Sequence, residues 1–245
     1  MKRNNRNSRF TLWITWLILL QLHQTNAACL TTLNELSLAE AAVVDFSTRR
    51  TYTLCPNTRF VVGRYDYSYH LVEGQDPLFL RPNLHVKCGD DGQRSNQCLI
   101  LTGDVLVTDT ASQHDVENTG GPIILQGLTL EDPGRHFVKL TQPNDVWFVD
   151  CVFRHATRAL VPLLLDYYQP NALQAQLKVH WHGCDFEGNR FSGAVAQPSL
   201  IVATNRQVSL ALHGCRFTDN DFVTDNEVVR LPICDCRRCF VFACF

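Results

Sequence analysis

The sequence predicts an all-β chain that folds as a right-handed parallel β-helix, a solenoid, with an N-terminal capping helix. Three observations support this fold class. A strand–bend–strand phrase recurs four times in one register, the bend residues tolerate left-handed backbone, and large apolar residues recur at the same offsets in every copy.

The recurring phrase is clearest in residues 208–220, where apolar residues alternate on both sides of Gly214. The inward residues change from even to odd offsets at Gly214, so a bend must separate two half-buried strands. The bend position is held in turn by Gly127, Asp150, Gly183 and Gly214, which lie 23, 33 and 31 residues apart. Glycine and aspartate enter left-handed backbone at the least cost. Units that bury their apolar face only by stacking on their neighbours are typical of a solenoid.

Stacking of the copies predicts two inward columns of side chains, with one member of each column in every coil. The columns are Leu128, Cys151, Cys184 and Cys215, and Leu130, Phe153, Phe186 and Phe217. Each large side chain that is buried in this way contributes about 1.5–3 kcal/mol.

Residues 32–43 are expected to form a short amphipathic helix. Thr32-Leu-Asn-Glu35 is a capping box, and Leu33, Leu36 and Val43 follow at helical spacing. A solenoid end exposes apolar layers and unpaired strand edges, so the helix is expected to cover the N-terminal end of the coil.

Short strands are expected before the first clear phrase, and a third strand is expected in each later coil. The early strands are 51–54, 60–62, 78–80, 84–87, 99–102 and 105–107, with 64–75 looped out. The third strands are 137–140, 161–165 and 200–203.

The chain divides into a signal peptide (1–27), the capping helix with the first strands (28–60), the β-helix (61–230) and a cysteine-rich tail (231–245). In the signal peptide, four basic residues precede the apolar run 10–22, and Thr25-Asn-Ala27 offers a cleavage site. Its removal leaves 18 basic against 24 acidic residues, a formal charge of −6 that argues against a nucleic-acid partner. Since no later segment is long and apolar enough for a membrane helix, we expect a secreted, extracellular protein.

Eleven cysteines on a secretory route imply disulfide bonds. Cys88 and Cys98 flank a polar turn between two apolar strands, and Cys29 and Cys55 bracket the first element, so these are the two expected pairs. The column cysteines are expected to act as small buried hydrophobes. Three interpretations of the tail stay open: a disulfide-bonded end piece, a truncated or misread terminus, and a metal site. The tail cysteines are Cys234, Cys236, Cys239 and Cys244.

Several of these features together resemble a known family. They are Cys29 before a short helix, Tyr52-Thr-Leu-Cys-Pro-Asn-Thr58, the hairpin from Leu84 that closes at Cys98, and the repeated Gly-Cys-x-Phe and Asp-Cys-x-Phe corners. Over residues 29–225 the chain resembles the pectin-lyase-like right-handed β-helix proteins, most closely the secreted β-helix domain proteins of marine microalgae such as diatoms. The superfamily resemblance implies a carbohydrate-facing scaffold, and the algal group implies no established activity.

The outward face before the bend carries the first candidate surface, formed by Trp147, His180, His182 and His213. His182 and His213 occupy the same position in successive coils. A sugar-binding strip with Trp147 as its stacking platform, or a metal site, is the functional interpretation. A solvent-facing imidazole stack is the favoured alternative, because we expect no carboxylate on that face to complete a ligand set.

The outward face after the bend carries the second candidate surface. Opposite charges alternate there between coils, which predicts the ion pairs Glu131–Arg154, Arg154–Glu187 and Asp185–Arg216. Asp185 and Glu187, with Arg154 and Arg216 beside them, are also candidate catalytic carboxylates for polysaccharide cleavage. The pectinolytic hydrolases that the chain resembles use an aspartate pair and a Gly-His-Gly phrase, of which His182-Gly183 and His213-Gly214 match only half.

The sequence therefore predicts a secreted, non-catalytic β-helix protein whose partner is an extracellular or cell-wall polysaccharide. The alternatives are a polysaccharide lyase or glycoside hydrolase, and a structural or adhesive wall protein. No cofactor and no metal ion are predicted, and the pattern indicates no oligomeric state.

Overall fold

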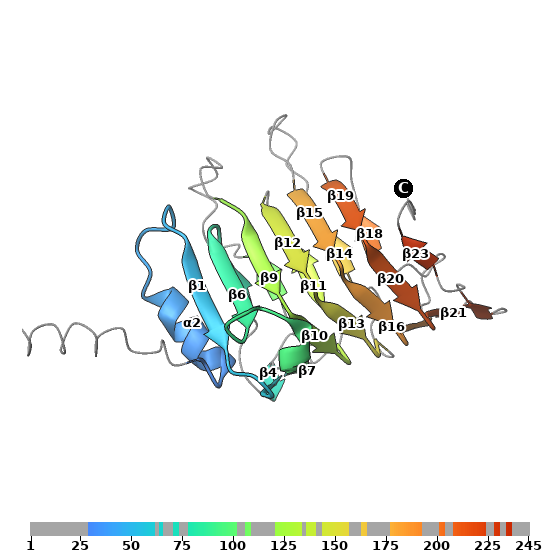
Figure 1. Cartoon of the computed structure of the whole chain (residues 1–245), viewed down its shortest axis with the longest axis horizontal. Coiled ribbons are helices and arrows are strands. Elements are labelled where there is room, and N and C mark those ends of the chain that lie inside the picture. Colours follow the sequence, from blue (N-terminus) through green and yellow to red (C-terminus); the bar gives the residue numbers. More distant parts are fainter. Residues whose placement is uncertain are drawn as a thin grey trace, which may run out of the picture.

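The computed structural model is a stack of short strands that wind into successive coils (Figure 1). It describes residues 29–61, 64–65, 71–73, 78–101, 106–108, 121–133, 136–140, 144–156, 163–165, 177–192, 201–203, 208–223, 228–230 and 234–236. The expected signal peptide lies outside these residues. Within them, no helix has the length and apolar character that crossing a bilayer requires.

Three parallel sheets form the body of the solenoid, and most coils contribute one strand to each sheet. The first sheet contains β1 (Arg50–Leu54), β6 (Leu84–Cys88), β9 (Ile123–Gln126), β12 (Asp145–Val149), β15 (Leu177–His182) and β19 (Val208–His213). The second contains β2 (Arg59–Val61), β7 (Cys98–Leu101), β10 (Leu128–Glu131), β13 (Val152–Arg154), β16 (Asp185–Glu187) and β20 (Cys215–Thr218), with β23 (Cys234–Cys236) at its edge. The third contains β5 (Leu78–Leu80), β8 (Leu106–Thr108), β11 (Val138–Leu140), β14 (Leu163–Leu165) and β18 (Ile201–Ala203).

The predicted register of the coils is confirmed. In the second sheet, Leu130, Phe153, Phe186 and Phe217 are successive partners. Each bend between the first and second sheets is left-handed, with φ of 68° at Gly127, 52° at Asp150, 63° at Gly183 and 61° at Gly214. The all-β parallel solenoid is therefore the fold of this chain.

The core runs along the inside of the coils and is almost entirely apolar. Phe153 stacks on Phe186, and Phe186 on Phe217, with ring centroids 5.0 and 4.7 Å apart. Cys151, Cys184 and Cys215 are buried free thiols, as expected. Each also donates a hydrogen bond to a carbonyl of the preceding coil, with Sγ–O distances of 3.4, 3.4 and 3.5 Å.

The helix α2 (Leu33–Ala41) lies at the β1 end of the stack (Figure 1). The predicted capping box is present, because Thr32 accepts from the Glu35 backbone and Glu35 accepts from the Thr32 backbone. Leu33 and Leu36 are buried in the core. The last turn is tied to the first coil by Glu40, whose carboxylate lies 2.8 Å from Arg50 Nε.

A second left-handed bend follows the second sheet, and the sequence pattern did not reveal it. Positive φ recurs there at Asp132, His155, Gly188 and Asp219. The residues that follow the last two of these bends, Asn189 and Asn220, are at most 1% exposed.

The two buried asparagines form a ladder that joins three coils. Asn189 Nδ2 donates to the Phe153 carbonyl (3.0 Å) and to Asn220 Oδ1 (2.9 Å), and Asn189 Oδ1 accepts from the Ala156 backbone (3.0 Å). Asn220 Nδ2 donates to the Phe186 carbonyl (2.8 Å). Because buried polar groups need partners, the ladder replaces the backbone hydrogen bonds that the bend cannot make.

Two segments differ from the sequence prediction. Residues 64–75, expected as a loop, contain the antiparallel strands β3 (Arg64–Tyr65) and β4 (Leu71–Glu73). At the other end, the short sheet of β17 (Arg190–Ser192), β21 (Asp221–Val223) and β22 (Val228–Arg230) becomes antiparallel at β22, and β23 is antiparallel to β20. The chain thus reverses direction after β21 instead of adding another parallel coil.

Candidate functional site

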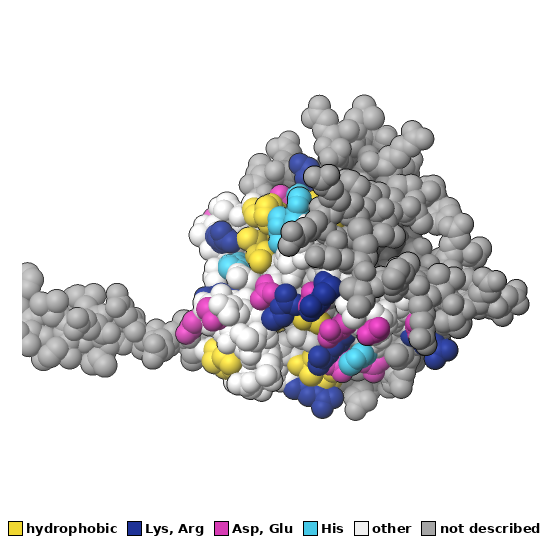
Figure 2. All heavy atoms as spheres, turned by 45° about the vertical axis from the view of Figure 1, so that its right-hand side comes forward, with side chains coloured by type: hydrophobic (Ala, Val, Ile, Leu, Met, Phe, Trp, Pro, Cys, Tyr) yellow, Lys and Arg dark blue, Asp and Glu magenta, His cyan; other side chains and the backbone are white. Residues whose placement is uncertain are grey.

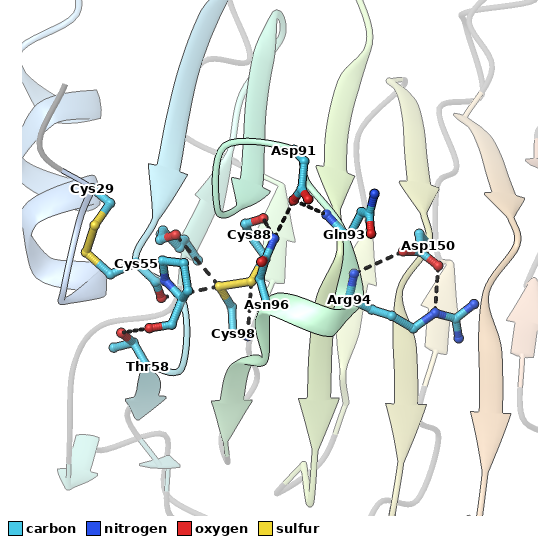
Figure 3. Close-up of a disulfide and its surroundings, with 12 residues drawn as sticks. Cys29, Cys55, Thr58, Cys88, Asp91, Gln93, Arg94, Asn96, Cys98 and Asp150 are labelled. Carbon is cyan, nitrogen blue, oxygen red and sulfur yellow. Dashed lines mark hydrogen bonds and ion pairs between the residues drawn. A yellow bond between two sulfur atoms is a disulfide. The ribbon is translucent and has the colours of Figure 1, made fainter. Parts of the chain in front are cut away.

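A disulfide-closed loop organises the outward face of the second sheet. Both predicted disulfides, Cys29–Cys55 and Cys88–Cys98, are present. The second closes residues 89–97, which contain the single-turn 3-10 helix η1 (Arg94–Asn96) and extend along the bends of the later coils (Figure 3). Gly127 has positive φ, and a Cβ built on it falls 2.3 Å from the Gly92 carbonyl oxygen. The loop therefore packs directly on the bend of the next coil.

Arg94 anchors this loop to two later coils. Its backbone N–H donates to Asp150 Oδ2 (3.0 Å) and its Nε to Asp150 Oδ1 (2.6 Å), as Figure 3 shows. Its two terminal nitrogens reach Asp185 Oδ2 (2.5 Å) and the Gly183 carbonyl (2.9 Å). Burial lowers the pKa of Arg94, but the neighbouring carboxylates of Asp185 and Asp150 outweigh burial and raise the pKa above its ordinary value. One side chain thus fixes the loop across the coils of β12 and β15.

Asp185 is held between two guanidinium groups. Arg216 lies 2.5 Å from the same Oδ2 atom that Arg94 contacts, and the Asp185 side chain is 9% exposed. We expected Asp185 on the open outward face, and the loop that carries Arg94 is the reason that it is buried instead. A carboxylate that accepts from two cations in this way is a structural anchor, and its oxygens are largely withdrawn from solvent.

Arg154 forms a second cluster on the same face. It lies 2.7 Å from Glu131 and 3.7 Å from Glu187, so the three predicted ion pairs are all present. Burial raises the pKa of Glu131, but hydrogen bonds from Arg154 and His155 dominate and lower it below its ordinary value. Asp185 and Glu187 therefore occur as separately paired carboxylates, each engaged by arginine.

The loop and the second sheet enclose a groove of about 570 Å³. Leu99, Thr129 and Val152 form part of its lining and are successive partners on adjacent strands. The other lining residues are polar, and they are Asn57, Thr58, Arg59, Arg94, Gln97 and Arg154.

The three arginines of the groove differ in their surroundings. Arg94 and Arg154 each contact two carboxylates, whereas Arg59 is exposed and makes no ion pair within the described part of the chain. Basic and acidic side chains are intermixed on the described surface in Figure 2. The groove therefore presents fixed hydrogen-bond donors and acceptors, with Arg59 as an available cation.

The first candidate surface also assembles as predicted, on the outward face of the first sheet. The ring centroids of Trp147 lie 4.7 Å from those of His180 and 5.1 Å from those of His182, and His182 lies 4.7 Å from His213. All three pairs are stacked. Trp147 therefore stacks on both His180 and His182.

A carboxylate, Asp145, also lies on this surface. Asp145 Oδ1 accepts from Trp147 Nε1 (2.6 Å) and lies 3.4 Å from His180 Nε2. Asp145 stands two residues before Trp147 on the same strand, so strand alternation places both on one face. Within the described residues, no group of three or more His, Cys, Asp and Glu side chains is arranged to hold a metal ion.

The surroundings of His182 affect its protonation. Burial, followed by the charges of His213 and His180, lowers the pKa of His182 below its ordinary value of 6.5. His182 Nε2 is buried and lacks a hydrogen-bond partner in the described part of the structure. The neutral imidazole of His182 is therefore favoured over the charged form.

Sequence analysis missed Arg94 and Arg59 as site residues. Arg94 lies in a polar turn with no periodicity, and its partners are 56 and 91 residues away in the chain. Arg59 belongs to the row of Leu99, Thr129 and Val152, but the early coils lack the bend signature that sets the register. Comparisons with protein-family models, curated proteins and solved structures found no match for this chain.

Proposed function

We propose that this chain is a secreted, non-catalytic β-helix protein that binds an extracellular or cell-wall polysaccharide in the groove beside the disulfide-closed loop. The observation that carries the proposal is the groove of about 570 Å³, lined by Arg59, Arg94, Arg154 and neutral hydrogen-bonding side chains. Ligand sites commonly have volumes of roughly 300–1,000 Å³ and a few polar groups that fix orientation.

The chemistry of the groove suits a sugar. Hydroxyl groups both donate and accept, and the groove offers guanidinium N–H donors beside the carbonyl and amide groups of Gln97 and Asn57. The ion pairs hold Arg94 and Arg154 in place, so little side-chain entropy is lost when a ligand binds. The partly exposed Leu99 and the methyl group of Thr129 can pack against the C–H face of a sugar ring.

The ion pairs favour binding over cleavage. A lyase or hydrolase needs carboxylates that can exchange protons with substrate, and two such groups at a defined separation. Asp185 is buried between Arg94 and Arg216, and Glu187 is paired with Arg154. These contacts oppose a catalytic role for the carboxylates, and the alternative enzyme is tested below by product release.

The proposal also includes an extracellular location, a right-handed coil and a capping role for α2. Two disulfides favour an oxidising, extracellular location. Crossovers between parallel strands are right-handed in about 98% of cases, which favours a right-handed coil of the pectin-lyase-like type. The buried residues Leu33 and Leu36 support the role of α2 as the N-terminal cap.

The experiment is a glycan array that contains algal and plant wall polysaccharides, probed with the purified chain and two variants. Arg59→Ala removes the available cation of the groove, and Arg49→Ala removes an equal charge at an exposed position outside it. Hydrogen bonds to charged groups are worth about 1.5–3 kcal/mol, so Arg59→Ala should weaken binding about tenfold or more. Arg49→Ala should leave binding unchanged. Absence of binding to every glycan would favour the structural or adhesive wall protein instead.

A further inference from the structure

The last strand of the second sheet places one tail cysteine opposite a free thiol. β23 runs antiparallel to β20, and its register pairs Cys215 with Cys236, Arg216 with Asp235 and Phe217 with Cys234. Cys215 is a buried free cysteine at the end of the column of thiols. Of the two cysteines in β23, only Cys236 has a cysteine as its register partner.

The backbone geometry at this pair suits a disulfide. Directly opposed residues of an antiparallel pair have Cα atoms about 4.5–5.5 Å apart. Disulfides span Cα separations of about 4.4–6.8 Å. Directly opposed positions of an antiparallel pair share one face of the sheet, and the register places position 236 opposite the buried Cys215.

We infer that Cys215 and Cys236 form a third disulfide bond, which fastens β23 to the last parallel coil. The two thiols lose two protons and two electrons as the S–S bond forms. The electrons pass to the disulfide of a thiol–disulfide oxidoreductase of the secretory route, by attack of one thiolate on that disulfide and release of the reduced enzyme by the second thiolate. The acceptor leaves as a dithiol, so atoms and electrons balance.

Burial of Cys215 does not oppose this reaction. Cys88 and Cys98 are both 0% exposed and are joined, so oxidation of such positions precedes or accompanies packing of the core. The thiols of Cys184 and Cys215 also differ in the direction of their pKa shifts. Burial raises the pKa of Cys184, whereas a hydrogen bond from the Cys184 thiol lowers the pKa of Cys215. The thiolate is the reactive form, which favours Cys215 over Cys184.

The bond would close an exposed edge. β20 is the last parallel strand of the second sheet, and an uncovered edge can pair with another chain. A covalent link between β20 and β23 keeps that edge occupied. This role does not depend on the proposed polysaccharide binding, since the groove lies at the β2, β7, β10 and β13 strands.

The test is disulfide mapping of the full chain after secretion from a eukaryotic host. Free thiols are alkylated before tryptic digestion without reduction, and linked peptides are identified by mass spectrometry. Cys215 falls in peptide 207–216, Cys184 in 179–190, and Cys234 and Cys236 together in 231–237. The matched variants Cys234→Ser and Cys236→Ser decide which tail cysteine is joined.

The inference predicts that peptide 207–216 is linked to 231–237 in the parent chain and in Cys234→Ser. In Cys236→Ser the link disappears and Cys215 is alkylated. If Cys236→Ser is not secreted, the parent and Cys234→Ser maps still decide the question. Alkylated Cys215 in the parent chain, a 207–216 link to 179–190, or loss of the link in Cys234→Ser would each overturn the inference.

Discussion

The packing of the disulfide-closed loop on the bends can be tested by adding one methyl group at two equivalent positions. Gly127→Ala and Gly214→Ala change the same bend position in two coils, and both glycines have left-handed φ. For an ordinary residue this backbone costs about 1–2 kcal/mol. The two sites differ in what surrounds the new methyl group, so their difference isolates the loop.

At Gly214, no atom of the described part of the chain lies within 4 Å of the added Cβ, and the expected loss is the backbone cost alone. At Gly127, the Cβ falls 2.3 Å from the Gly92 carbonyl oxygen and 2.7 Å from its carbon. Both are backbone atoms of a loop held by the Cys88–Cys98 disulfide and by Arg94, so the loop cannot move aside freely. Overpacking of this kind adds about 1–3 kcal/mol.

The assay is thermal unfolding of the two purified variants and the parent. For a chain of this size, 1 kcal/mol shifts the melting temperature by about 2–4 °C, so Gly127→Ala should melt at least about 2 °C below Gly214→Ala. Hydrogen exchange of residues 89–97 should rise only in Gly127→Ala. Equal melting temperatures with unchanged exchange would refute the packing of the loop on this bend.

Three further predictions concern the ladder, the loop anchor and the histidines. Asn189→Ala removes the hydrogen-bond partner of the buried Ala156 N–H and of the Phe153 carbonyl, and each lost bond costs about 1–3 kcal/mol. Thermal unfolding should therefore show a loss of about 2–5 kcal/mol in the free energy of unfolding. The control Arg190→Ala changes an exposed residue and should show almost no loss. In urea unfolding, Arg94→Ala should lower the free energy of unfolding more than Arg216→Ala. Arg94 also pairs with Asp150, and its side chain is 34% exposed, whereas that of Arg216 is 59% exposed. The opposite order would contradict the anchor role of Arg94. The pKa of His182 is lowered in the folded state, so the unfolded chain takes up a proton at His182 more readily than the folded chain. The stabilisation from neutral His182 is therefore complete above pH 6.5 and is lost as the pH falls below 6.5 toward the lowered pKa of the folded state. The melting temperature should therefore decline from about pH 7.5 to 5.5, and His182→Gln should flatten the decline if the imidazole is its source.

The repeat pattern was sufficient to predict the coils because it depends on local chemistry. Left-handed bends at Gly127 and Gly214, and the stacking of Phe153, Phe186 and Phe217, follow from residue type and spacing alone. The same register brought His182 and His213 together and aligned Arg154 with Glu131. Side chains at equal offsets in successive coils must become neighbours, so these contacts were predictable.

The contacts that the sequence did not predict depend on where segments without a repeat pack against the coils. Arg94 meets Asp150 and Asp185 only because the disulfide-closed loop lies along later bends, and no periodicity indicates that course. The ladder of Asn189 and Asn220 was missed because the second bend uses Asp, His and Gly in turn and so has no uniform residue. Asp145 was overlooked although strand alternation places it beside Trp147. The repeat pattern therefore could not predict the groove of the candidate site, whereas it did predict the histidine surface.

One experiment tests the central claim, that the ion-paired face binds polysaccharide without cleaving it. The chain is incubated with each insoluble wall polysaccharide, and the bound protein and the released reducing or unsaturated ends are measured in the same tube. The account predicts depletion of the protein by at least one polysaccharide, weakened in Arg59→Ala, with no product above the protein-free control. Product release that is abolished by Asp185→Asn or Glu187→Gln would contradict the account and establish an enzyme.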